Sequence, residues 1–206
     1  MDDKLELYGA LTGNCIRAAI ALEEANLPYA VTHVDLRMGQ QRQALVLALN
    51  PRGQVPVLVK HSVAAPLVLT QSNAIIMFAA SAAPDALLQG GSAKNIALVQ
   101  ERFFYFITDV IAVSHAAFAL RGASYDESAH FLDARFIAAL KVAENFLRDS
   151  QFIAGDAFSI ADIAAFTIVR STKNQLPWTR LPRMAKWYDM LETRPAVSRG
   201  LRVFDI

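Results

Sequence analysis

The first loop of the chain carries side chains that could stabilise an ionised thiol. Thr12 and Asn14 stand between an alternating strand pattern over residues 5–8 and a helical pattern over residues 16–25. A hydroxyl and an amide at the start of a helix can donate hydrogen bonds to a thiolate, and these donors and the helix dipole lower the pKa of a thiol. The loop therefore predicts either a thiolate site or only the capping of a helix.

A proline interrupts the apolar segment 55–59, which otherwise has the pattern of a strand. Because proline cannot donate to the ladder, Pro56 fits either an edge strand or a cis peptide bond that turns the backbone outward. A cis bond would leave the N–H and C=O of Val55 open to pair with the backbone of an extended peptide. Both interpretations stay open from the residues alone.

Gln71 and Ser72 follow the strand pattern 67–69 and open a helical pattern over residues 72–82. The unpaired N–H groups and the positive end of the dipole at such a point favour a carboxylate, and the Ser72 hydroxyl could donate to it. The alternative is that Ser72 only caps the helix.

The elements around these segments divide into two kinds. Residues 1–83 read as β-α-β-α-β-β-α, residues 84–92 have the proline, glycine and polar content of a linker, and residues 93–206 show helical spacing only. Capping boxes are predicted at 124–127 and at Ser159–Asp162, where Asp162 should fix a helix start and not act as a catalytic acid. The predicted fold class is α/β followed by all-α.

Composition excludes several classes of protein. Hydrophobic residues make up 54% of the 206 and the formal net charge is +1, which argues against disorder and against a nucleic-acid partner bound through phosphates. No run of about 18 apolar residues predicts a membrane span, and no metal-ligand cluster is evident. The acidic start of the chain lacks a secretory signal, so a cytoplasmic location is expected.

Four segments, in this order and at this spacing, resemble the cytosolic glutathione transferases. Residues 50–58 carry an N-P-x-G-x-V-P-x-L strand, and residues 70–75 a strand–helix turn. Residues 158–163 carry an S-x-A-D box, and residues 194–197 an R-P ending. The resemblance implies a thioredoxin-like domain over residues 1–83, a linker, a helical domain over 93–206, and a homodimer that uses glutathione as co-substrate.

The same resemblance implies how glutathione is held. Its cysteinyl backbone would pair with Val55 before a cis Pro56, and Gln71 and Ser72 would hold its γ-glutamyl carboxylate. Thr12 and Asn14 resemble the T-P-N-G loop of the bacterial Nu class, in which threonine and asparagine contact the sulfur.

Other positions depart from the family pattern or extend it. Gln41 resembles a glutamine that touches glutathione. Gln54 stands where many members have lysine or arginine, so the glycyl carboxylate would bind a neutral amide, and this hydrogen bond would be weaker than one to a cation. Cys15 replaces a glycine of the loop and reads as a small buried side chain or as a partner in a mixed disulfide with glutathione. Tyr105 is the candidate polar group of an apolar second-substrate pocket.

The predicted function is a glutathione transferase whose thiolate attacks a small apolar electrophile, a disulfide or a peroxide. The Nu-class likeness favours disulfide reduction slightly. The main alternative is a non-catalytic ligand-binding or stress-response protein on the same fold. A glutathione-dependent isomerase or dehalogenase is a third possibility, but no serine-rich loop supports it.

Overall fold

Four strands form a mixed sheet near the start of the chain. The computed structural model describes residues 4–62, 65–86 and 88–205. The strands lie in the order β2-β1-β3-β4, with β1 parallel to β2 and antiparallel to β3, and β3 antiparallel to β4. Their bounds are β1 Leu5–Gly9, β2 Tyr29–His33, β3 Val57–Lys60 and β4 Leu67–Leu69. The third strand is shorter than the predicted 55–59 because its ladder begins only after Pro56.

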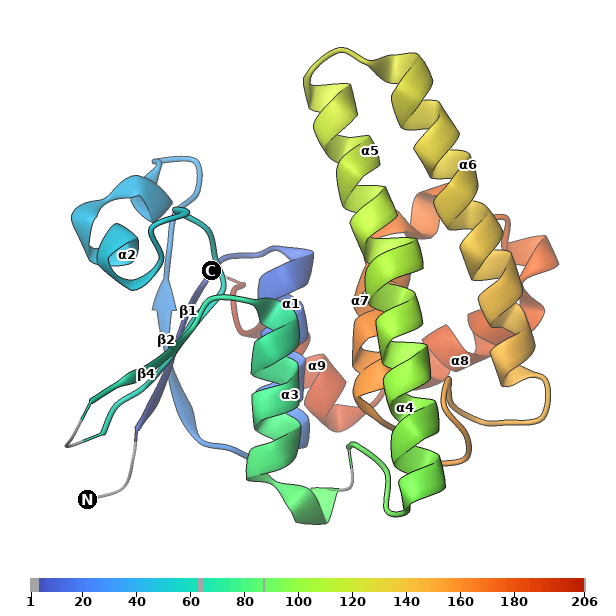
Figure 1. Ribbon diagram of the computed structural model, residues 1–206, viewed down its shortest axis with the longest axis horizontal. Coiled ribbons are helices and arrows are strands. Elements are labelled where there is room, and N and C mark those ends of the chain that lie inside the picture. Colours follow the sequence, from blue (N-terminus) through green and yellow to red (C-terminus); the bar gives the residue numbers. More distant parts are fainter. Residues whose placement is uncertain (1–3, 63–64, 87, 206) are drawn as a thin grey trace. The chain divides into compact units, whose positions relative to one another are not determined.

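Helices cover both faces of this sheet (Figure 1). Because side chains alternate along a strand, Tyr8 and Val57 share one face, where they form a buried cluster with Val46 of α2. Leu7 points to the opposite face and is fully buried, on the side where α1 and α3 lie next to each other. The helices of this unit are α1 Gly13–Glu24, α2 Ala44–Leu49, α3 Ser72–Ala82 and α9 Pro195–Arg202.

The C-terminal segment belongs to the sheet-containing unit. The chain divides into one unit made of the residues up to Leu87 together with those from Thr193 onward, and a second unit, Leu88–Glu192. The predicted helical domain, 93–206, is therefore wrong for its last residues. Two ion pairs hold α9 to α1, Arg194 to Glu24 at 2.5 Å and Arg199 to Glu23 at 2.6 Å.

Close backbone contact completes the attachment of α9. An added Cβ at Gly200 would lie 2.7 Å from Cγ1 and 2.8 Å from Cα of Ile20 in α1, so only glycine allows this approach. The ring of Phe204 covers Gly9 at the end of β1. Local helical spacing could not reveal this attachment, since it depends on which unit the helix packs against.

Replacing Gly200 by alanine is expected to lower the free energy of unfolding by about 1–3 kcal/mol, because the backbone of α1 cannot move away from the new methyl group. Gly122→Ala is the matched control, since nothing lies within 4 Å of its added Cβ. Urea unfolding of both variants measures the difference. Equal stabilities for the two would contradict the close packing of α9 on α1.

The second unit is helical throughout its regular elements. Its central helix is α7, in which every residue from Ile160 to Val169 is buried. Five helices make up the unit with short 3-10 turns between them: α4 Ala93–Tyr105, α5 Ala112–Gly122, α6 Asp126–Ala143, α7 Ile160–Thr172 and α8 Pro182–Glu192. Together the two units confirm the predicted fold class, an α/β thioredoxin-like part and an all-helical part.

A π-helical turn, Phe106–Ile111, joins α4 and α5 into one continuous helix, Ala93–Gly122. This helix is long and apolar enough to cross a membrane, although charged residues interrupt its apolar run in the sequence. Core helices of soluble proteins pass the same test, and the buried Phe103 and Val110 belong to segments that contact α7 and α6. Packing within its own unit therefore explains only part of its apolar composition, since 28% of its most apolar stretch is buried.

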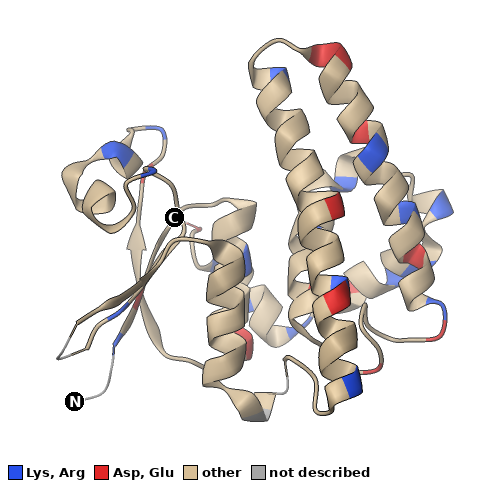
Figure 2. Cartoon of the chain, viewed as in Figure 1, with Lys and Arg blue, Asp and Glu red and all other residues tan. Residues whose placement is uncertain are grey.

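The two predicted capping boxes differ in outcome. Ser159 and Asp162 form a reciprocal box at the start of α7, as predicted. The predicted box at 124–127 is absent, because Ser124 has a left-handed φ of 65° and Tyr125 precedes α6 without a side-chain cap. Acidic Asp126 and Glu127 in the first turn complement the helix dipole instead. Along the helices of this unit, basic and acidic residues are interspersed (Figure 2).

Candidate functional site

The predicted ligand residues meet at one edge of the sheet. In the pairing of β1 with β3, Tyr8 near the end of β1 lies opposite Val57 at the start of β3. In the pairing of β3 with β4, Leu58 lies opposite Leu69 at the end of β4. The loop after β1, the segment before β3 and the turn after β4 therefore emerge at the same edge. The residues that the sequence singled out lie in these connections or in the first turn of the helix that follows, and they are Thr12, Asn14, Val55, Gln71 and Ser72.

The loop after β1 ends in a capped helix. Thr12 is the N-cap of α1, and its Oγ1 accepts a hydrogen bond of 3.3 Å from the N–H of Cys15. Thr12 therefore caps the helix, which is one of the two roles that the sequence left open. It leaves the hydroxyl proton of Thr12 available to donate to a ligand, since the cap uses only the oxygen.

Cys15 faces the interior and not the loop surface. Its side chain has no exposed area, and burial raises the pKa of its thiol, against the opposing effect of the Thr12 hydroxyl. A mixed disulfide with glutathione would require an accessible thiolate. The geometry therefore supports the interpretation of Cys15 as a small buried side chain.

A residue that the sequence analysis missed connects two of the predicted ones. Arg17, one turn into α1, is 2% exposed and donates from one guanidinium nitrogen to Oδ1 of Asn14 at 3.0 Å and to Oγ of Ser72 at 3.3 Å. Burial lowers the pKa of its guanidinium to about 10, so it is protonated at neutral pH. A charged residue on the otherwise apolar face of a helix, three positions after Asn14, was the available signal.

The peptide bond between Val55 and Pro56 is cis, as the resemblance implied, and this decides between the two interpretations that the residues alone left open. None of the hydrogen bonds within residues 4–62, 65–86 and 88–205 uses the N–H or C=O of Val55. The turn before it is held by buried Asn50, whose Nδ2 donates to the Gln54 carbonyl at 2.7 Å and whose Oδ1 accepts from the Arg52 N–H at 3.2 Å. The Gln54 side chain itself is exposed.

The two remaining glutamines differ in their surroundings. Gln41 lies in a 3-10 turn, Gln40–Arg42, whose backbone is close to Gly53. Its Oε1 is buried and has no hydrogen-bond partner among the residues that the structure describes, which is costly unless a ligand donates to it. Gln71 precedes α3, is exposed and makes no side-chain capping bond. Both side chains are available to a ligand.

Tyr105 has a structural contact within the helical unit. Its hydroxyl donates to the carbonyl of Ala139 in α6 at 2.7 Å, and its ring packs edge-on against Phe146 and Phe106. The phenol therefore ties α4 to α6. Its single proton is already used, which leaves only an acceptor for the predicted second-substrate role.

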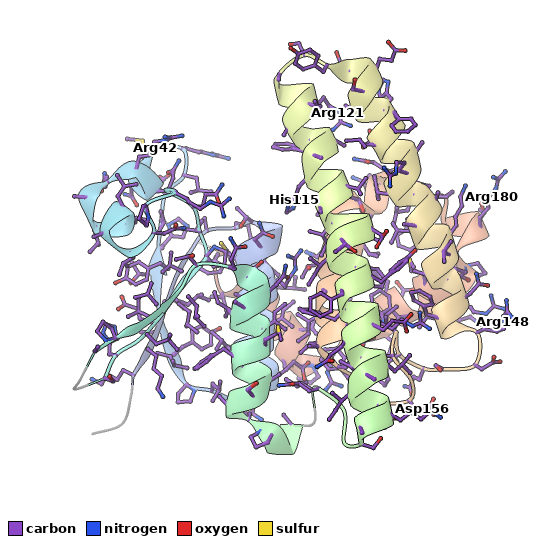
Figure 3. The ribbon with its side chains drawn as sticks, in the orientation of Figure 1. Arg42, His115, Arg121, Arg148, Asp156 and Arg180 are labelled. Atoms are coloured by element: carbon purple, nitrogen blue, oxygen red, sulfur yellow. The ribbon has the colours of Figure 1, made fainter. Side chains whose placement is uncertain are left out.

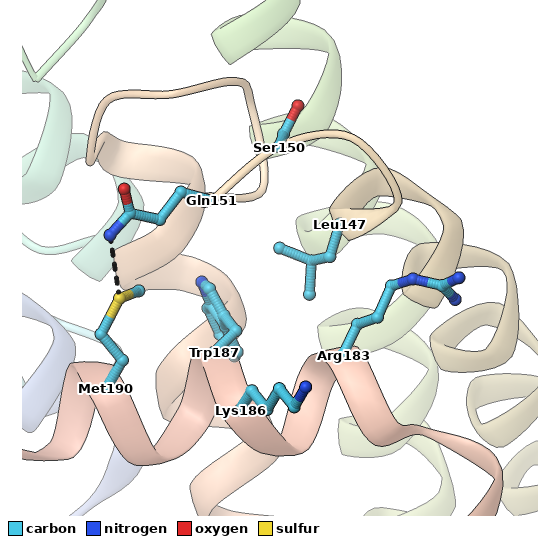
Figure 4. Close-up of a pocket in the computed structure, with 7 residues that line it drawn as sticks. All are labelled: Leu147, Ser150, Gln151, Arg183, Lys186, Trp187 and Met190. Carbon is cyan, nitrogen blue, oxygen red and sulfur yellow. Dashed lines mark hydrogen bonds between the residues drawn. The ribbon is translucent and has the colours of Figure 1, made fainter.

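A separate pocket of about 230 Å³ lies in the helical unit (Figure 4). It is bordered by the cations of Arg183 and Lys186 and by the ring of Trp187, and Gln151 donates to the sulfur of Met190 at 3.2 Å. None of the predicted glutathione residues lines it. Within the described ranges, no group of three or more His, Cys, Asp or Glu could hold a metal ion.

Comparison with known proteins agrees with these two units. Models of the glutathione S-transferase N-terminal domain and C-terminal domain match residues 13–82 and 102–189. The disulfide-bond oxidoreductase YfcG of Escherichia coli strain K12 is 26% identical over 204 residues, covering 96% of this chain and 94% of that protein. Glutathione S-transferase 3 of Zea mays is 30% identical over 209 residues, covering 95% and 92%.

A solved structure shows the same fold with ligands. The crystal structure of a glutathione transferase from Burkholderia graminis, with two glutathione molecules bound per subunit, is 25% identical. The TM-score is 0.85, and the match covers 97% of this chain and 88% of that one. With both domain models matched in order and a relative at 30% identity along nearly the whole chain, this chain belongs to the glutathione S-transferase family.

Proposed function

We propose that this glutathione transferase binds glutathione along the sheet edge where the three connections meet. The cysteinyl backbone pairs with the N–H and C=O of Val55, and its sulfur lies at Thr12 and Asn14. Gln71 and Ser72 receive the γ-glutamyl carboxylate at the N-terminus of α3, where helix N–H groups favour an anion.

The remaining contacts come from the segment between β2 and β3. Gln41 accepts a hydrogen bond from the ligand, which satisfies its buried Oε1. Gln54 approaches the glycyl carboxylate with a neutral amide, which favours a weaker hold than a cation would give.

The unpaired backbone of Val55 carries this proposal. A strand-like peptide needs both a donor and an acceptor at a sheet margin, and Val55 offers both next to β3. Thr12, Asn14 and Ser72 lie at the same edge. A glutathione paired with Val55 therefore has hydrogen-bond donors near both its thiolate and its γ-glutamyl carboxylate.

The chemistry proposed is nucleophilic attack by the glutathione thiolate on a small apolar second substrate. With a disulfide, the thiolate forms a new S–S bond to one sulfur, the old S–S bond breaks, and the departing thiolate takes up a proton. The thiolate of a second glutathione then attacks the glutathione sulfur of the mixed disulfide, which forms glutathione disulfide, and the other half of the substrate leaves as a thiolate that takes up a proton. The name of the Escherichia coli relative, a disulfide-bond oxidoreductase, supports testing disulfides before electrophiles and peroxides.

The oligomeric state and the cellular location are part of the same proposal. The family resemblance supports a homodimer and a cytoplasmic enzyme without nucleic-acid or membrane partners. Within the helical unit, the apolar helix Ala93–Gly122 packs against α6 and α7.

Ser72→Ala is expected to weaken glutathione binding about 10- to 100-fold, because one hydrogen bond to a charged group is lost. Isothermal titration calorimetry of wild type and variant measures this change. Ser128→Ala, an exposed serine within α6, is the control and should bind as the wild type does.

Two results would count against the proposal. Equal affinity of the Ser72→Ala variant and the control would remove Ser72 from the site. Absence of wild-type binding at millimolar glutathione would remove the site as a whole, and apolar ligands would then be screened on a non-catalytic protein.

A further inference from the structure

Arg17 is the only residue among those described that hydrogen-bonds to two of the predicted glutathione contacts. It lies on α1, whereas Ser72 begins α3, so one buried guanidinium connects the loop after β1 with the turn after β4. The predicted sulfur end and the predicted carboxylate end of the ligand are therefore joined through a single side chain.

The guanidinium determines how Asn14 is turned. Guanidinium nitrogens only donate hydrogen bonds, so Asn14 can meet Arg17 only through its carbonyl oxygen, Oδ1, at 3.0 Å. The two N–H bonds of the same amide must then point away from Arg17. An asparagine turned in this way presents donors, which a thiolate needs, whereas the flipped amide would present an acceptor and repel it.

Arg17 also orients the hydroxyl of Ser72. Its Oγ accepts from Arg17 at 3.3 Å, which directs the hydroxyl proton elsewhere and leaves it free to donate to a carboxylate. Ser72 is 8% exposed, so its rotation is limited by the surrounding atoms. In both residues the contact with Arg17 takes up an acceptor and leaves a donor.

Burial strengthens this effect. Arg17 is 2% exposed, and hydrogen bonds from a charged donor are stronger than neutral ones, more so in a medium of low polarity. The positive charge also favours negative groups placed next to Asn14 and Ser72.

We propose that Arg17 is a positioning residue, which rests on the proposed function: it fixes Asn14 and Ser72 as hydrogen-bond donors, so that the glutathione thiolate and the γ-glutamyl carboxylate are both received by donors. Arg17 acts through these two side chains and does not touch the reacting atoms.

The test is a double-mutant cycle of Arg17→Met with Asn14→Ala. Methionine keeps much of the volume but removes the donors and the charge. Glutathione affinity is measured by calorimetry, and the pKa of the bound thiol by the ultraviolet absorbance of the thiolate against pH. Arg199→Met, which removes an exposed ion-paired arginine of the same unit, is the control and should change neither quantity.

Three results are expected. Arg17→Met weakens glutathione binding about 10- to 100-fold and raises the pKa of the bound thiol by about one unit. In the wild-type background, Asn14→Ala raises the pKa of the bound thiol by about one unit or more. In the Arg17→Met background, it changes this pKa by less than about half a unit, because the amide there is no longer oriented.

Two results would overturn the inference. One is unchanged affinity and unchanged thiol pKa in a folded Arg17→Met protein. The other is an Asn14→Ala effect of the same size with and without Arg17, which a purely structural role would give. If Arg17→Met does not fold, Arg17→Leu, which also removes the donors and the charge, is used in the same cycle and judged by the same two criteria. Wild-type protein that does not bind glutathione would instead reject the proposed function itself.

Discussion

Replacing Asp162 by alanine is expected to lower the free energy of unfolding by about 3–5 kcal/mol, the largest loss of stability that we predict. The carboxylate is fully buried. Its Oδ1 accepts from the Ile153 N–H and from Trp187 Nε1, both at 2.9 Å. Its Oδ2 accepts from the Ser159 N–H at 3.0 Å and the Ser159 hydroxyl at 3.1 Å.

The size of this effect follows from the donors that would be left behind. Removing the carboxylate leaves several buried N–H groups without an acceptor, and each costs about 1–3 kcal/mol when unsatisfied. These donors come from the preceding loop, the start of α7 and α8, so one side chain holds three segments of the helical unit together.

Chemical unfolding of Asp162→Ala measures this loss. Asp156→Ala is the control, because Asp156 is an exposed acidic residue of the same loop (Figure 3). A loss below about 1 kcal/mol for Asp162→Ala, within the range of ordinary surface substitutions, would show that the network is not required. Glutathione affinity per folded molecule should stay near that of the wild type, since Asp162 lies outside the ligand edge.

Asn14→Ala is expected to lower the rate of the glutathione-dependent reaction at neutral pH about 10- to 100-fold. The variant loses one donor to the thiolate, worth about 1.5–3 kcal/mol for a charged partner, which raises the pKa of the bound thiol by one to two units. The rate should recover as the pH rises, because the thiol then ionises without help.

A pH–rate profile with glutathione and a small disulfide measures this change. Asn174→Ala, at an exposed position of the helical unit, is the control and should follow the wild-type profile. A rate loss in Asn14→Ala that is the same at every pH would contradict a role in ionising the thiol.

Local signals in the sequence were sufficient for most of the fold. Alternating and helical spacing predicted the order of strands and helices, and proline at 56 with its surrounding motif predicted the cis bond. The box at Ser159 and Asp162 was predicted correctly because both its members lie within one turn of a helix. Features of this kind depend on neighbours in the sequence.

Features that depend on distant neighbours were missed. Helical spacing in α9 does not say that the helix packs against α1, which Gly200 and the pairs of Arg194 and Arg199 bring about. Arg17 was overlooked because its importance comes from Ser72, which is 55 positions away. For Tyr105, nothing in the run of aromatic residues indicates a hydrogen bond to Ala139 on another helix.

The most direct test of the account is the ionisation of glutathione bound to the wild-type protein. Thiolate absorbance is followed against pH at a glutathione concentration that saturates the site in calorimetry. We predict that bound glutathione has a thiol pKa at least about one unit below the ordinary cysteine value of about 8.5. A bound thiol that titrates at the ordinary value, or no binding at millimolar glutathione, would contradict the account.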